Sequence, residues 1–151
     1  MISLPLESNI RPIEMNEISL ASAITKSCKG LSRGFNGEEQ ETLEEWINDD
    51  DNTILGAIVD EKIIGICMMG TYKSNKEKVA WLRELAVHPN YQNRGIGRSL
   101  IQYGLDWAIG RGATQSFLAT DVENDNAIYL YTKHGYVKQD GRGEIVMGKK
   151  L

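Results

Sequence analysis

One stretch of the chain, residues 85–99, joins the end of an apolar strand to a glycine-containing turn that opens a helix. Gly95 and Gly97 stand in this turn, and glycine, which has no Cβ, lets backbone N–H groups approach a ligand closely. The first helical turn would add unpaired N–H donors and the positive end of the helix dipole. Arg94 and Arg98 flank the turn with guanidinium groups that suit a pyrophosphate or a sugar phosphate. The stretch therefore indicates an anion site, although a plain loop with two solvated arginines would contain the same residues.

Two other phosphate-binding motifs are excluded by the residues around this turn. A Walker A loop needs Gly-Lys followed by Ser or Thr, and the chain contains no such tripeptide. A dinucleotide-binding fingerprint would place a third glycine at position 100, where the chain has Leu100. The turn therefore belongs to neither of these classes.

A second motif lies in the C-terminal half of the chain. It reads Asn124-x-x-Ala127-x-x-x-Tyr131-x-x-x-Gly135-Tyr136, and it spans a helical stretch and the start of a strand. Asn124 could cap this helix, because asparagine is among the preferred residues at a helix N-cap.

Together the two motifs resemble those of the Gcn5-related N-acetyltransferase (GNAT) family. The first motif is Gln92-x-x-Gly95-x-Gly97 after a strand that ends in Leu-Ala-Val, and one helix and one strand separate it from the second. The resemblance covers residues 79–137. The N-terminal half resembles the family only in its order of elements, which is a strand, two helices and a hairpin.

The resemblance implies transfer of an acetyl group from acetyl-CoA, used as a co-substrate without a metal, straight to a primary amine of a small molecule or peptide. The main chain of Leu85, Ala86 and Val87 would hold the pantetheine arm. The same strand would offer an N–H to the thioester oxygen, where negative charge develops. Asn124 would bind the pantetheine arm or a bridging water. The pyrophosphate would lie against the turn, whose residues are Gln92, Asn93, Arg94, Gly95, Ile96, Gly97, Arg98 and Ser99.

Two residues are catalytic candidates by the same resemblance. Tyr131 would protonate the departing thiolate as a general acid, although it could instead be a packing aromatic. Glu84, the one acid between residues 79 and 87, would accept the proton of the amine. Strand alternation places Trp81 and Arg83 on one face and Glu84 on the other unless a bulge intervenes. A salt-bridged surface role for Glu84, with waters relaying the proton, stays an alternative.

An acidic run from residue 38 to residue 51 bears on the amine acceptor. An acidic rim would attract a cationic acceptor, whereas a charge run of this kind is also typical of a solvated helix face. The sequence leaves both interpretations open. The run contains eight acids and no base: Glu38, Glu39, Glu41, Glu44, Glu45, Asp49, Asp50 and Asp51.

The elements that must position these residues can be predicted from hydrophobic period and turn residues. A short strand near residues 10–13 and two helical stretches, the second over 38–48, come first. Strands over 53–59 and 63–71 form a hairpin, and a third strand covers 79–87. Further along we expect a helix over about 97–109, a strand over 116–120, a helix over about 125–133 and strands around 136–137 and 145–147. The apolar face of the helix over 97–109 consists of Leu100, Ile101, Gly104, Leu105, Ala108 and Ile109.

This order predicts a single domain, residues 1–151, of the α/β or α+β class, with helices packed on one sheet. The resemblance sharpens it to a GNAT-type acyl-CoA N-acyltransferase fold, with a mixed, mostly antiparallel sheet and helices on both faces. The acetyl-CoA-binding core would be residues 79–137, and the acceptor-site helices would lie within about 14–51. Many members of the family are dimers, and the sequence marks no interface that decides for or against a homodimer.

Composition excludes several classes. The net charge of −4 argues against a general nucleic-acid binder. The longest apolar stretch, residues 63–69, is far below the ~20 residues needed to cross a membrane, and no targeting segment is visible, so we expect a cytoplasmic protein with no membrane partner. Two rival functions remain: a non-catalytic acyl-CoA-binding or regulatory module, against which Tyr131 argues, and an aminoglycoside N-acetyltransferase, which only the acidic run supports.

Overall fold

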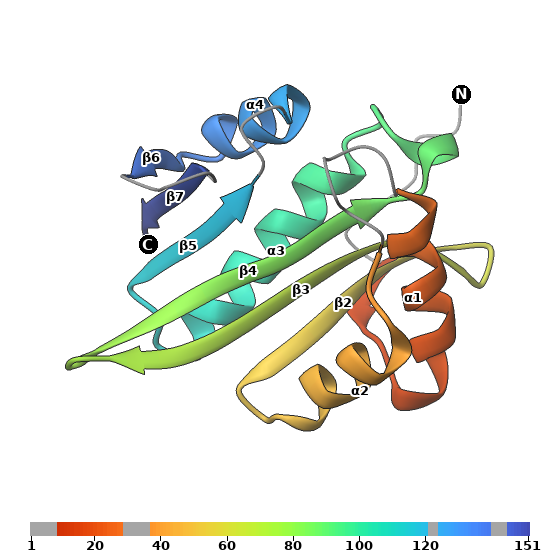
Figure 1. Cartoon of the computed structure of the whole chain (residues 1–151), viewed down its shortest axis with the longest axis horizontal. Helices are drawn as coiled ribbons and strands as arrows, with labels where there is room; N and C mark the ends of the chain where they lie inside the picture. The colour runs from red at the N-terminus through yellow and green to blue at the C-terminus, as the bar shows by residue number, and fades with distance from the viewer. Residues whose placement is uncertain (1–8, 29–36, 121–123, 140–144) are drawn as a thin grey trace.

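The computed structural model describes residues 9–28, 37–120, 124–139 and 145–151 (Figure 1). The expected elements are all present within these ranges. In chain order they are β1 (Ile10–Pro12), α1 (Ile18–Ser27), α2 (Gln40–Asn48), β2 (Asn52–Val59), β3 (Lys62–Ser74), β4 (Glu77–Val87), α3 (Ile96–Gly110), β5 (Gln115–Thr120), α4 (Asp125–Lys133), β6 (Val137–Gln139) and β7 (Ile145–Lys150), with 3-10 turns at Met15–Glu17 and Pro89–Tyr91.

The strands form one seven-stranded sheet in the order β1-β2-β3-β4-β5-β7-β6. Every neighbouring pair is antiparallel except β4 and β5, which run parallel in the middle of the sheet. Helix α3 provides the crossover that a parallel pair requires. The prediction of a mixed, mostly antiparallel sheet is therefore confirmed.

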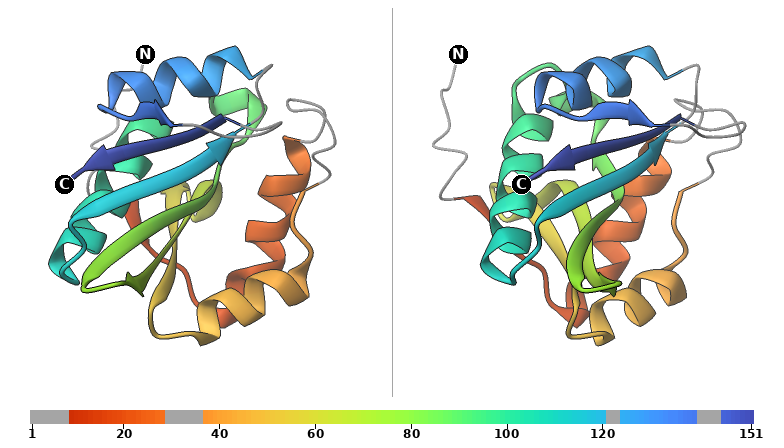
Figure 2. Two further views of the ribbon diagram at one scale, coloured as in Figure 1. Left: turned by 60° about the vertical axis from the view of Figure 1, so that its left-hand side comes forward. Right: turned by 90° about the vertical axis from the view of Figure 1, so that its left-hand side faces the viewer.

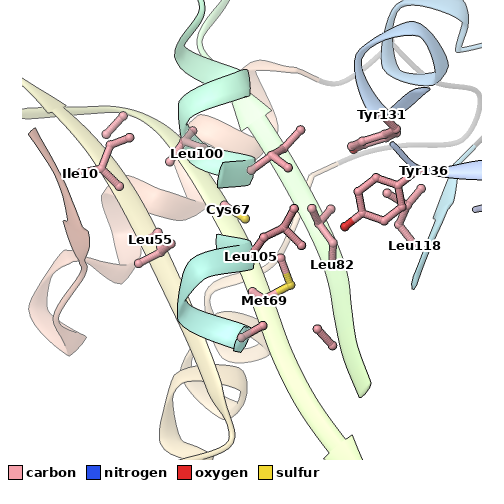
Figure 3. Close-up of a cluster of buried hydrophobic side chains, with 14 of the residues drawn as sticks. Ile10, Leu55, Cys67, Met69, Leu82, Leu100, Leu105, Leu118, Tyr131 and Tyr136 are labelled. Carbon is pink, nitrogen blue, oxygen red and sulfur yellow. The ribbon is translucent and has the colours of Figure 1, made fainter. Parts of the chain in front are cut away.

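Helices cover both faces of the sheet, as predicted (Figure 2). On one face, Ile18 and Ala21 of α1 and Leu43 of α2 pack in a buried cluster with Ile66 and Met68 of β3. The other face holds α3 and α4. There the buried cluster includes Cys67, Met69, Leu82, Leu100, Leu105, Leu118, Tyr131 and Tyr136 (Figure 3).

Helix α3 packs closely on β3 because of one glycine. A Cβ at Gly104 would lie 2.9 Å from Met69 Cε and 3.1 Å from Cys67 Sγ, so a side chain there would require these neighbours to shift. The predicted apolar face is buried except at Ile109, which is 50% exposed, so that part of the prediction is wrong. At about 100° of rotation per residue, Ile109 falls roughly 40° beyond Leu105 and outside the buried arc.

Cys28 and Cys67 are both buried free thiols. None of the helices within the described ranges is both long and apolar enough to cross a membrane.

Candidate active site

A β-bulge in β4 sets the direction of two charged side chains. Met68 of β3 pairs with Glu84 and Met69 pairs with Leu82, so Arg83 is the extra residue between them. An extra residue reverses the alternation of side chains beyond it. Arg83 and Glu84 consequently share the face covered by α1 and α2. The alternation expected without a bulge, which places them on opposite faces, does not hold.

The end of β4 leaves one edge open. Strand β5 pairs with β4 only as far as Leu82, which pairs with Leu118, and no ladder partner among the described residues follows on that side. His88 N–H donates to Ile64 O of β3 at 2.8 Å. Because an antiparallel ladder alternates bonded and non-bonded pairs, Leu85 and Val87 direct their N–H and C=O groups to the open edge.

Of the three strand residues predicted to hold the pantetheine arm, Leu85 and Val87 thus present main-chain groups to the opening, whereas those of Ala86 face β3. The carbonyl of Val87 already accepts a hydrogen bond from Gln92 Nε2 at 2.9 Å and one from Cys28 Sγ at 3.3 Å. Gln92 therefore ties the glycine turn to the end of β4.

The glycine turn begins α3 beside this opening. Asn93 and Gly95 have φ angles of 63° and 83°, and Gly95 is the N-cap of α3 with no side-chain cap. The N–H groups of the first turn are therefore available as donors to an anion. A Cβ at Gly97 would lie 3.4 Å from Leu130 Cδ2 and 3.9 Å from Leu85 Cδ2, so the start of α3 is wedged between α4 and β4.

The two arginines of the turn are both exposed. The Arg94 guanidinium carbon lies 5.4 Å from the centre of the Tyr91 ring, which the preceding 3-10 turn presents. Both side chains stand on the rim of a helix N-terminus, where a guanidinium can pair with a phosphate.

Asn124 begins α4 as its N-cap. Its Oδ1 accepts a hydrogen bond from Ala127 N–H at 3.2 Å, which confirms the capping role. The contact with a pantetheine arm stays a prediction.

Tyr131 lies on α4 and is 7% exposed. Its ring meets that of Tyr136 edge to face, with 5.9 Å between centroids. The Tyr136 hydroxyl is hydrogen bonded to Ser116 Oγ at 2.7 Å, while the Tyr131 hydroxyl has no hydrogen bond to another described residue. Burial, and then the neighbouring Glu84, raise the pKa of Tyr131 well above its ordinary value. The hydroxyl therefore stays protonated and can donate.

Glu84 is partly buried, and the pKa of its carboxyl group is raised. Burial, and then the nearby Glu38 carboxylate, raise the pKa of Glu84 to about 7, against the opposing effects of the Leu85 backbone and of Arg83. A carboxylate whose pKa lies near neutrality is suited to accept a proton from an amine. A carboxyl group with its pKa near neutrality, on Glu84, and a hydroxyl that stays protonated, on Tyr131, thus come from the two faces of the sheet.

The acidic run is mostly a solvated surface. Seven of its eight acids are exposed, and Glu38 alone is turned toward the sheet, with an exposed side-chain fraction of 15%. Its Oε2 lies 3.5 Å from Arg83 Nη2. The sequence could not separate Glu38 from the other acids, because its direction depends on contacts with α1. Within the described ranges, no three His, Cys, Asp or Glu residues gather as a metal site.

Comparisons with known proteins show the family and the fold. The model of a family described as the acetyltransferase (GNAT) family matches residues 21–136, which is more than half of the chain. A protein of Yersinia pestis (strain Pestoides F) named "Acetyltransferase" is 30% identical over 142 residues, covering 94% of either chain.

Two solved structures share the fold. The PaiA N-acetyltransferase of Thermoplasma acidophilum, solved in complex with coenzyme A, aligns with a TM-score of 0.82 at 20% identity, over 94% of this chain and 98% of that one. The ribosomal-protein-S18-alanine N-acetyltransferase of Escherichia coli aligns with a TM-score of 0.76 at 22% identity, over 94% and 92% of the two chains. At such identities the likeness concerns the fold.

Proposed function

Because the chain belongs to the acetyltransferase (GNAT) family, we propose that it transfers an acetyl group from acetyl-CoA directly to a primary amine of a small molecule or peptide. The observation that carries this proposal is the pair formed by Glu84 and Tyr131 at the open edge of β4. One is a carboxylate with its pKa raised to about 7, and the other is a hydroxyl held protonated. A module that only bound acyl-CoA would need neither.

The residues at the opening fit coenzyme A as a ligand. The N–H and C=O groups of Leu85 and the N–H group of Val87 face the open edge, where an extended amide-containing arm could pair with them. The first-turn N–H groups of α3, with Arg94 and Arg98 beside them, suit a pyrophosphate. The coenzyme A bound to the Thermoplasma protein, which shares this fold, supports the same use here.

The proposed chemistry divides between two side chains. Acetyl-CoA, when bound, supplies an acetyl group activated as a thioester. Glu84 takes a proton from the ammonium form of the acceptor, which frees the nitrogen lone pair for attack on the acetyl carbonyl, and the nitrogen loses a second proton to solvent as the amide forms. The N–H groups of β4 at the open edge would donate to the carbonyl oxygen as its charge grows. Tyr131 Oη gives its proton to the sulfur as the carbon–sulfur bond breaks, and it regains one from solvent.

The test is a titration with acetyl-CoA by calorimetry, followed by a thiol-release assay over a panel of amines. The panel holds polyamines, aminoglycosides, amino acids and peptides with free N-termini. Binding together with turnover on one class supports the proposal and identifies the acceptor class. Binding without turnover on any amine would favour the non-catalytic module. Absence of acetyl-CoA binding would overturn the proposal.

A further inference from the structure

Glu38 is held in place through its own main chain. Its N–H donates to Thr25 Oγ1 at 2.8 Å, and its carbonyl accepts from Ser22 Oγ at 2.7 Å. Both hydroxyls belong to buried residues of α1, with exposed fractions of 0% for Thr25 and 2% for Ser22. These two hydrogen bonds fix the point from which the Glu38 side chain extends toward β4.

The Arg83 guanidinium lies close to both Glu38 and Trp46. Arg83 Nη2 is 3.5 Å from Glu38 Oε2, and the guanidinium carbon is 5.7 Å from the centre of the Trp46 ring. The bulge puts Arg83 and Glu84 on one face, so the nearest carboxylate along the chain is that of Glu84. Nevertheless, within the part of the chain that the structure describes, no ion pair joins Arg83 to Glu84.

We propose that Glu38 is a positioning residue for the reaction: it holds the Arg83 guanidinium away from Glu84 and leaves the Glu84 carboxylate free to accept a proton from the acceptor amine. This inference rests on the proposed function, in which Glu84 is the base. A directly paired arginine would stabilise the ionised carboxylate and make it a weak base. The Glu38 carboxylate, close to Glu84, has the opposite effect.

The other titratable groups near Glu84 are neutral around neutral pH. Burial is the largest cause that raises the pKa of the two thiols and the phenol that interact with Glu84. The charged neighbours among the described residues are thus one cation and one anion. From the elements packed around Glu84, the groups are Cys28 at the end of α1, Cys67 on β3, Tyr131 on α4, Arg83 on β4 and Glu38 before α2.

The opposite charges of Glu38 and Arg83 predict opposite shifts of the Glu84 pKa when each is neutralised. Glu38→Gln removes the repelling carboxylate and releases Arg83, so the acidic limb of the kcat/KM profile should move to lower pH by about one unit or more. Arg83→Gln removes the attracting cation and should move the same limb to higher pH. Glu39→Gln, a change at the exposed neighbouring acid, is the matched control and should leave the limb in place.

A merely structural role of Glu38 and Arg83 would not move the acidic limb in opposite directions in the two variants. If both variants move the limb in one direction, or if neither moves it while Glu84→Gln abolishes it, the inference is overturned and the proposed function stands.

A second measurement separates the inference from the proposed function. Carbon-13 NMR of labelled glutamate carboxyl groups follows the Glu84 titration in the protein without substrates, with the Glu84 signal assigned by its loss in Glu84→Gln. We expect a lower pKa of Glu84 in Glu38→Gln and a higher one in Arg83→Gln. If both pKa shifts are seen while Glu84→Gln retains full activity, Glu38 and Arg83 act on the Glu84 carboxyl group as inferred. The proposed role of Glu84 as base is then overturned. An unchanged Glu84 titration in both variants overturns the inference by itself.

Discussion

Glu84 and Tyr131 come from elements that belong to opposite faces of the sheet, yet the Glu84 carboxylate is close enough to contribute to the raised pKa of the Tyr131 hydroxyl. Glu84 shares the α1–α2 face with Ala86, and Tyr131 belongs to the cluster under α3 and α4. Glu84 lies beyond the last β4–β5 pair, which is at Leu82. We propose that a reacting molecule that uses both side chains binds at this edge of β4.

Replacing Tyr131 with phenylalanine tests its role as proton donor. The change removes the hydroxyl and keeps the ring that packs on Tyr136. We expect kcat to fall by roughly 10²-fold or more, with little change in acetyl-CoA affinity measured by calorimetry. Tyr129→Phe is the matched control, because Tyr129 lies on the same helix and is 63% exposed. A loss of binding with unchanged kcat would indicate a packing role instead.

Replacing Glu84 with glutamine tests the base. We expect kcat/KM to fall by about 10²- to 10⁴-fold, as for removal of a general base. The wild-type profile should show an acidic limb near pH 7, because the pKa of Glu84 is raised to about 7 and its ionised form is the active one. Measuring kcat/KM against pH for both proteins shows whether this limb disappears in the variant. A limb that persists in Glu84→Gln would assign it to another group.

The same substitution has a predicted effect on stability. Between pH 4.5, the ordinary pKa of a glutamate side chain, and about pH 7, the folded protein keeps a proton on Glu84 that the unfolded chain has lost. The free energy of unfolding therefore decreases as pH rises through this range, by about 1.4 kcal/mol per pH unit and at most about 3.5 kcal/mol in all. A glutamine at this position does not ionise, so Glu84→Gln does not lose free energy of unfolding in this way. The free energy of unfolding of Glu84→Gln minus that of the wild type should therefore rise with pH and level off above about pH 7. Urea denaturation at several pH values measures the difference, and a pH-independent difference would contradict the prediction.

The glycine turn was predicted as an anion site, and Arg98 supplies its test. Arg98→Gln should weaken acetyl-CoA binding about tenfold, because a charge-assisted contact to a phosphate is lost. Arg111→Gln is the control: it changes the net charge equally, but Arg111 follows the other end of α3, about 20 Å away, where it lies over Trp107. Calorimetry at low and moderate salt measures both. Equal weakening by the two variants would mean that net charge alone is responsible.

The fold could be predicted because its signals are local. Helix α4 was expected over about 125–133 and covers Asp125–Lys133, since Asn124 supplies the cap and Gly135, with φ 90°, lies just past the end. The hairpin of β2 and β3 was marked by Asp60 and Glu61, which both have positive φ in the turn. Such features depend on a few neighbouring residues and are therefore visible in one sequence.

The site was predictable only in part, because several of its contacts join residues that are far apart in the sequence. The bulge at Arg83 depends on how β4 pairs with β3, and no residue type in the strand predicts it. Glu38 differs from the other acids of its run only through its hydrogen bonds to Ser22 and Thr25, which lie more than ten residues earlier. The residues that carry the expected chemistry could be named from sequence, whereas the contacts that adjust their pKa values required the structure.

The last prediction concerns the packing of α3 on the sheet. Gly104→Ala would place a Cβ 2.9 Å from Met69 Cε and 3.1 Å from Cys67 Sγ, under the middle of the helix. Met69 can move its terminal methyl group, but Cys67 is fully buried on β3, so the overpacking should lower the free energy of unfolding by about 1–3 kcal/mol. Gly110→Ala in the same helix has nothing within 4 Å of the new Cβ and should instead be neutral or stabilising, by up to about 1 kcal/mol, because alanine is the better helix former. Chemical denaturation of both variants measures this difference in sign. A Gly104→Ala protein as stable as the wild type would show that Met69 and Cys67 make room for the new Cβ at no cost, and that the close packing of α3 on β3 does not depend on Gly104.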